Sequence, residues 1–126
     1  MEQVRLVARD QLMETTQTPG MARREAFATE RAWVGIVQVE AGIESGWHHH
    51  GDYDTYIYVT VGEARLEFGP GGGDAVDAVA GDFVMIPAHT VHRETNPGSQ
   101  ESAAVLFRVG AGTPVFNVDG PDTPAT

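Results

Sequence analysis

The 126-residue chain contains no cysteine, no excess of positive charge and no long apolar run. The lack of cysteine excludes disulfides and thiolate metal sites, and it leaves the redox compartment open. A formal net charge of −10 would repel nucleic acids and anionic membrane surfaces, so neither is expected as a partner. No stretch approaches the length that spans a bilayer, and residues 1–16 lack the apolar core of a signal peptide. We therefore expect a soluble cytoplasmic protein.

A sustained helical period of apolar residues is also missing beyond residue 32, and a short helix is expected only over Val4–Met13. Segments with the β-branched and aromatic composition of strands recur instead at short spacing. They cover residues 33–39, 55–61, 64–68, 75–79, 83–86, 103–109 and, as an edge strand, 115–118. Fifteen glycines and seven prolines supply the turns, among them a hairpin tip at Gly69–Asp74.

The length suits one domain, because a second would have too little chain to build its own core. Many short strands joined by glycine-rich turns predict an all-β fold, either a sandwich or a barrel. We expect a single domain over residues 1–126, with a core barrel at about 30–118 and flexible termini. The polar, proline-containing end at 117–126 is expected to fray.

Three of the five histidines are consecutive, in the stretch GWHHHGDYD. In an extended strand, residues two apart project to the same face, so His48 and His50 can converge while His49 points away. His92 follows a later strand-like segment, and it would join the pair if the sheet brings it opposite. Asp54 is a carboxylate within reach of the same cluster. On this pattern alone, a solvent-exposed histidine loop remains the alternative to a metal site.

Two motifs in this region resemble those of the cupin superfamily. The first motif is matched by Gly42, His48, His50 and Gly62. The second motif is matched by Gly81, Pro87, His92 and Asn96. The resemblance covers residues 42–96. It implies a small jelly-roll β-barrel, with a metal ion held by His48, His50 and His92.

The chain departs from the family pattern at two positions. Thr55 stands where the first motif usually carries a glutamate, seven residues before Gly62. Asp54 is adjacent, but a shift of one residue reverses the face of a strand, so it could ligate only if the chain bulges after His50. A metal site with three histidine ligands and no carboxylate ligand is therefore favoured. His89 replaces a glycine of the second motif; because histidine tolerates positive φ, a surface turn is favoured over a polar group near the cavity.

Other positions are interpreted mainly as structural. Ile57, Val59 and Val61 share the inward parity of their strand and are expected inside the barrel. Tyr58 is expected outside, at a candidate subunit interface. Trp47 could form a wall of the metal site or simply pack.

Arginines allow one functional interpretation. Arg65 and Arg108 lie on expected strands, and an arginine inside the barrel would indicate an anionic substrate. An exposed charge on an outer face is the commoner fate of such a residue. The segment Arg23-Arg24-Glu25 is expected to form a solvated, charged edge.

A site of three neutral imidazoles accepts a divalent transition metal: iron, zinc, nickel, manganese, copper or cobalt. Three protein ligands leave coordination positions open, as in catalytic rather than structural metal sites. We interpret the chain as a metal-dependent enzyme acting on a small molecule, with an oxygenase as the favoured reaction. Asp54 or Glu94 is the candidate base, partner group or, for Asp54, fourth ligand.

Three alternatives remain open: an isomerase or lyase that uses the same metal, a non-catalytic module that binds a metal or a small ligand, and a metal-free structural barrel. Exposed sheet edges and unassigned apolar residues in the N-terminal third predict a homodimer.

Overall fold

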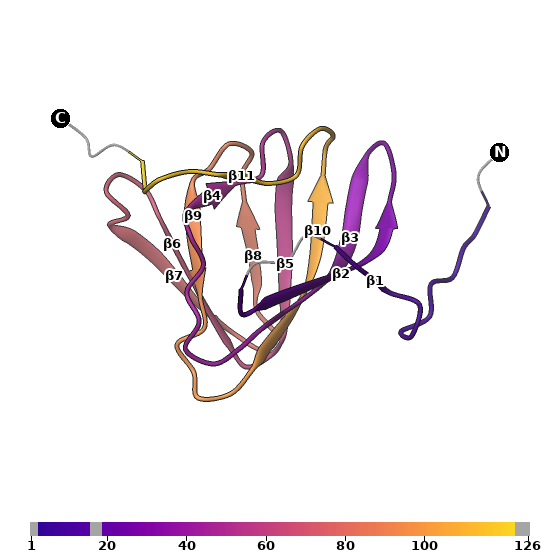
Figure 1. The fold of residues 1–126 in the computed structure, drawn as a ribbon, viewed down its shortest axis with the longest axis horizontal. Helices are drawn as coiled ribbons and strands as arrows, with labels where there is room; N and C mark the ends of the chain where they lie inside the picture. The colour runs from indigo at the N-terminus through magenta and orange to yellow at the C-terminus, as the bar shows by residue number, and fades with distance from the viewer. Residues whose placement is uncertain (1–2, 16–18, 123–126) are drawn as a thin grey trace.

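The computed structural model describes residues 3–15 and 19–122, and over these residues it contains strands but no helix. Two antiparallel sheets make up the fold (Figure 1). The six-stranded sheet has the order β1 (Met13–Glu14), β2 (Met21–Ala28), β3 (Ala32–Val39), β10 (Ser102–Val109), β5 (Asp54–Val61) and β8 (Phe83–Ile86). The five-stranded sheet has the order β11 (Phe116–Asn117), β4 (His48–His49), β9 (His92–Thr95), β6 (Glu63–Phe68) and β7 (Asp74–Val79). No helix in the described residues is long and apolar enough to cross a membrane.

The core lies between the two sheets, because alternate residues of the long strands are apolar and face inward. The buried apolar residues are Met21, Trp33, Val37, Ile57, Val59, Leu66, Ala78, Ile86, Ala104 and Leu106. They come from seven strands of both sheets, so each sheet covers the apolar face of the other. The result is the all-β jelly roll expected from the sequence.

All seven segments expected as strands are confirmed to within one residue at each end. The hairpin tip at Gly69–Asp74 is confirmed as well, because Phe68 pairs with Asp74 across it. Strands β1, β2, β4 and β9 were not expected. Two of them have only two residues, and β9 carries polar side chains, so none shows the apolar composition of a strand.

The helix expected over Val4–Met13 is wrong. This segment is irregular, and in Figure 1 it extends as an arm away from the sheets. Val4 and Leu6 are among the most exposed apolar residues of the described chain, at 103% and 86%. A short helix depends on burying its apolar face, and Val4 and Leu6 remain exposed here.

Two further expectations are corrected. Val61 is exposed rather than inside the barrel, because the pairing of β5 with β10 shifts register between Ala103 and Ala104, at the end of the strand. Arg23 is buried, with 5% exposed, rather than part of a solvated edge. It shares the inward face of β2 with Met21. Ile57 and Val59 are buried as expected.

The end expected to fray is held in place as far as the structure describes it. Asn117 pairs with His48, the Val118 amide donates to the Trp47 carbonyl, and the Gly71 amide donates to the Asp122 carbonyl. Residues 123–126 lie outside the described residues. The segment after β10 therefore crosses the end of the molecule beside β4, as Figure 1 shows.

Candidate metal centre

Four side chains on the inward face of a short strand pairing, or directly after it, converge in the interior. His48 on β4 is paired directly with His92 on β9, and Glu94 lies two residues further along the same face of β9. His50 follows β4 on the parity of His48. One candidate ligand atom from each of these four residues lies within 4.8 Å of the others. The three imidazoles are buried, with at most 4% exposed.

Each of the three imidazoles is oriented by a backbone carbonyl. The Nδ1 atoms of His48, His50 and His92 lie 2.9, 2.8 and 2.9 Å from the carbonyl oxygens of Gly46, Pro114 and Thr90. A carbonyl only accepts hydrogen bonds, so each Nδ1 carries the proton and donates it. The Nε2 atom of each neutral ring therefore has a free lone pair, which is the form that binds a metal.

Two of these lone pairs have no protein donor to accept from in the described part of the chain. The Nε2 atoms of His48 and His92 are buried and have no hydrogen-bond partner among residues 3–15 and 19–122. Nε2 of His92 lies 3.6 Å from Oε1 of Glu94, so two acceptor atoms face each other. That distance is too long for a hydrogen bond, yet it suits two ligands of one ion with bonds of about 2.0–2.2 Å. The residues present fit a bound divalent metal.

Burial also keeps the cluster in its metal-binding protonation state. It lowers the pKa of His48, and it lowers the pKa of His50 to about 3, with the nearby charge of Arg108 as the second cause. Burial acts to raise the pKa of Glu94, but the facing His92, then His48 and Arg23, outweigh it and hold that pKa well below its usual value. Near neutral pH, His48 and His50 are therefore neutral and Glu94 is a carboxylate.

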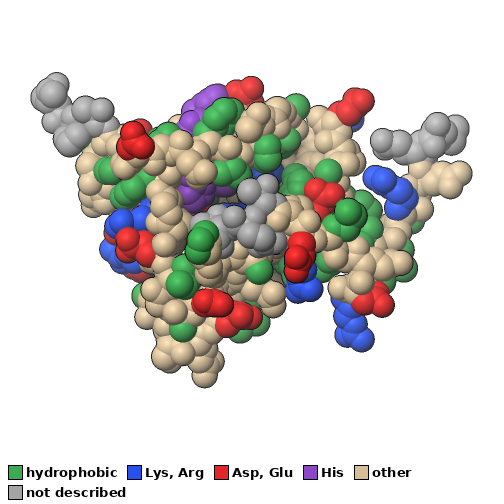
Figure 2. All heavy atoms as spheres, viewed as in Figure 1, with side chains coloured by type: hydrophobic (Ala, Val, Ile, Leu, Met, Phe, Trp, Pro, Cys, Tyr) green, Lys and Arg blue, Asp and Glu red, His purple; other side chains and the backbone are tan. Residues whose placement is uncertain are grey.

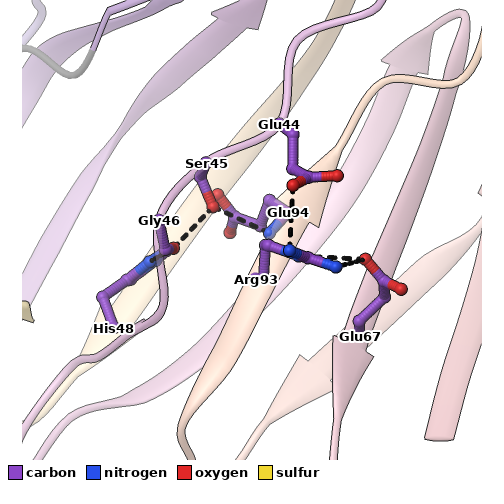
Figure 3. Close-up of polar contacts among 7 residues, drawn as sticks. All are labelled: Glu44, Ser45, Gly46, His48, Glu67, Arg93 and Glu94. Atoms are coloured by element: carbon purple, nitrogen blue, oxygen red, sulfur yellow. Dashed lines mark hydrogen bonds and ion pairs between the residues drawn. The ribbon is translucent and has the colours of Figure 1, made fainter. Parts of the chain in front are cut away.

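A polar clamp on the other face of β9 fixes this geometry (Figure 3). The Ser45 amide donates to the Glu94 carbonyl, and the Glu94 amide donates to Ser45 Oγ. Arg93 donates to Glu44 at 2.8 Å and to Glu67 on β6 at 2.9 Å. Its guanidinium also lies 4.6 Å from the centre of the Trp47 ring. Trp47 therefore packs on the outside against Arg93.

The other predicted residues of the site lie elsewhere. Asp54 is outside the converging group: its Oδ1 accepts a hydrogen bond from the Ala88 amide, and the chain makes no bulge that would turn it inward. His49 turns away and stacks on Phe116, with 4.9 Å between ring centres. His89 has φ of 60° and an exposed side chain that contacts Asp52, which confirms the expected surface turn.

Two buried arginines complete the interior. Arg108 on β10 and Arg23 on β2 are 3% and 5% exposed. The sequence allowed for a buried Arg108, whereas it gave no indication that Arg23 is buried. Recognising β2 as a strand would have placed Arg23 on the same face as Met21, but the polar sequence MARREAFA conceals that alternation.

A cavity of about 420 Å³ lies between β7 and β8 and reaches the centre. Its walls are largely apolar, formed by inward-facing residues such as Leu66, Ala78, Val84 and Ile86, and His92 also lines it. Figure 2 shows one face of the molecule, on which histidine side chains gather near β4 among scattered acidic and apolar ones. The dimensions suit a small organic molecule that enters between the sheets.

Comparison with known proteins supports this fold. An uncharacterized conserved protein with a double-stranded β-helix domain, from Klebsiella pneumoniae subsp. pneumoniae, has a TM-score of 0.73 at 20% identity. The match covers 93% of this chain and 99% of that one. The polyketide cyclase RemF from Streptomyces resistomycificus has a TM-score of 0.74 at 20% identity, covering 92% and 86% of the two chains.

A mutant of Bacillus subtilis oxalate decarboxylase has a TM-score of 0.72 at 19% identity. The match covers 84% of this chain but only 30% of the decarboxylase. No protein with a curated description matches the sequence. Structural likeness at these identities establishes the fold alone.

The family model described as the cupin domain matches residues 35–110, which is more than half of the chain. The matched region runs from within β3 to the residue after β10. It contains all four side chains of the candidate metal centre. The chain therefore belongs to the cupin domain family.

Proposed function

We propose that this protein is a metal-dependent enzyme that acts on a small molecule, with His48, His50 and His92 as metal ligands. The observation that carries the proposal is the common orientation of the three rings. Each donates its Nδ1 proton to a carbonyl, and the buried Nε2 atoms of His48 and His92 have no partner in the described chain. Leaving such acceptors unsatisfied is costly, and a cation would satisfy them.

Of the two carboxylates that the sequence offered as a base or partner group, Glu94 is the one that lies in the converging group. It faces His92 at 3.6 Å and is ionised, so it can either complete the ligand set or take a proton from a substrate. A bound divalent metal would supply either a site for dioxygen next to the substrate, if it is redox-active, or Lewis-acid polarisation of a substrate oxygen. The chain itself orients the ligands and buries the Nε2 atoms of His48 and His92.

Oxygenation is the reaction we favour, as three histidines leave coordination positions open for substrate and oxygen together. Glu94 favours a second candidate, a metal-dependent lyase or isomerase in which this carboxylate moves a proton. Two structural neighbours are named as a decarboxylase and a polyketide cyclase. Those names belong to other proteins, but they support keeping non-oxidative chemistry as the second candidate.

The first experiment measures metal content in untagged protein, because a histidine tag would bind metal itself. After removal of metal with a chelator, the protein is reloaded separately with Fe²⁺, Mn²⁺, Ni²⁺ and Zn²⁺. We expect about one ion per chain. Less than a tenth of an ion with every metal would contradict the proposal and favour a metal-free barrel.

The second experiment tests turnover. Oxygen uptake by the Fe²⁺-loaded protein is measured over diketones, phenols and thiols, and substrate loss without oxygen is measured with the other metals. Oxygen uptake supports the oxygenase, and anaerobic turnover supports the lyase or isomerase. Tight metal binding without turnover in either assay would contradict the enzyme and favour a non-catalytic binding module.

A further inference from the structure

Arg108 is a buried cation with unused hydrogen-bonding capacity. Its side chain is 3% exposed, and its Nε has no hydrogen-bond partner in the part of the chain that the structure describes. The guanidinium lies 4.7 Å from the centre of the Trp33 ring, which holds it against the wall of the barrel. A buried donor without an acceptor costs stability, and such groups are retained where a ligand satisfies them.

A second unused polar group lies beside it. Thr55 on β5 is the direct cross-strand partner of Arg108, and its buried Oγ1 also has no partner among the described residues. The same row continues to Ile86 on β8, a wall of the 420 Å³ cavity. The cavity wall, the hydroxyl and the guanidinium therefore lie in one inward-facing row across three strands.

This row is electrostatically coupled to the metal centre on the opposite sheet. The charge of Arg108 acts on both His50 and Glu94. Among the described residues, Glu94 is the carboxylate whose charge acts on Arg108. That carboxylate also belongs to the metal-binding group, so a divalent cation there would take up its charge. Arg108 would then be a buried cation beside a second cation, which favours an anion between them.

We infer that the substrate is an anion, and that its carboxylate or equivalent oxyanion accepts hydrogen bonds from Arg108 Nε and the Thr55 hydroxyl beside the metal centre. This rests on the proposed function, because it names the substrate class of the same site. Thr55 stands where the related motif has a glutamate, which would repel such an anion. The threonine instead offers a donor.

The test is calorimetric titration of malonate into Zn²⁺-loaded protein, with the neutral diamide malonamide as the uncharged probe of similar shape. We expect malonate to bind and malonamide to bind at least about tenfold more weakly, because hydrogen bonds to charged groups are the stronger ones. Arg108→Gln is expected to weaken malonate binding by about tenfold or more, and Thr55→Val by about threefold or more. Arg65→Gln is the matched control, because Arg65 is an exposed arginine paired with Asp77 on the outside.

Zinc content is measured for every variant before titration, which separates this inference from the proposed function. A wild-type protein that binds no zinc contradicts the function. Zinc-loaded protein that does not bind malonate, or binds malonamide equally well, overturns the inference alone. The inference also fails if Arg108→Gln and Thr55→Val bind malonate as tightly as Arg65→Gln does. If Arg108→Gln does not fold, Thr55→Val decides, since valine keeps the shape of threonine.

Discussion

Backbone carbonyls, rather than side chains, orient the three histidines of the candidate centre. The carbonyl that accepts from His50 belongs to Pro114, 64 residues further along the chain. The other two belong to residues two positions before their histidines. The ligand geometry therefore depends on the path of the loops before β4, before β9 and after β10. A substitution in these loops can rotate an imidazole without changing any ligand.

Replacing His50 tests whether it binds the metal, and replacing its neighbour His49, which points away, is the matched control. A ligand bound only by the folded state stabilises it by about 2.7 kcal/mol when its concentration is a hundredfold above the dissociation constant. We expect Zn²⁺ to raise the melting temperature of wild-type protein and of His49→Ala, and to have no such effect on His50→Ala. Each shift is taken relative to the same variant without metal, because removing His50 also leaves a cavity. Equal zinc-induced shifts in the two variants would contradict the assignment of His50.

Strand β9 connects the metal centre to the outside of the five-stranded sheet, because its alternate residues face opposite ways. His92 and Glu94 face inward, and Arg93 between them faces Glu44, Glu67 and Trp47. These contacts tie together β9, β6 and the segment that leads into β4. Because β4 has only two residues, its few backbone bonds cannot hold His48 in register without such support.

Arg93→Met tests the clamp. The substitution keeps an apolar stem against Trp47 but leaves the half-buried Glu67 carboxylate without its donors. We expect a loss of about 1–3 kcal/mol in the free energy of unfolding, measured by urea denaturation. Arg65→Met removes an exposed ion pair on the same sheet and should cost at most about 1 kcal/mol. A cost for Arg93→Met no larger than that of the control would show that the clamp does not stabilise the sheet.

The strands that the sequence predicts are those whose apolar residues alternate or run together, such as β3, β5 and β10. Of the strands it does not predict, β4 is held by β9 and β11, which lie far along the chain. Strand β2 forms a hairpin with β3, but the charged run Arg23-Arg24-Glu25 at its centre conceals its alternation. The same limit applies to the site. The spacing of His48 and His50 follows from strand geometry, but the inward position of Glu94 depends on the register of β9 against β4. No local pattern encodes that register.

At the scale of the whole molecule, the surface and the interior differ in charge. The chain has a formal net charge of −10, yet two of its eight basic residues, Arg23 and Arg108, are buried beside the centre. The acidic surface would slow the approach of an anion, whereas the interior would attract it. For the anionic substrate inferred above, Arg108 would therefore contribute affinity rather than a high association rate.

The outer face of the six-stranded sheet carries a group of exposed apolar side chains. Two rows of apolar side chains cross β10, β5 and β8 on this face: Phe107, Tyr56 and Met85 in one, and Val105, Tyr58 and Phe83 in the next. The rings of Tyr58 and Phe83 in the second row are 4.6 Å apart. The two rows are two residues apart along each strand, so they form one patch. Contiguous exposed patches of this kind mark interfaces. The occupant we propose is a second copy of this chain, because a two-fold axis through the patch would bury it in both copies.

Light scattering after size exclusion should therefore give twice the chain mass of 13.5 kDa. Phe107→Glu places a charge in the middle of the patch and should yield a monomer, because burying an unpaired carboxylate in an apolar interface costs more than the contact gains. Val79→Glu is the control: Val79 is similarly exposed, at 53% against 43% for Phe107, but lies on β7 of the other sheet. This variant should remain a dimer. A monomer mass for the wild-type protein would exclude the dimer. A dimer for Phe107→Glu, together with a monomer for Val79→Glu, would move the interface to the five-stranded sheet.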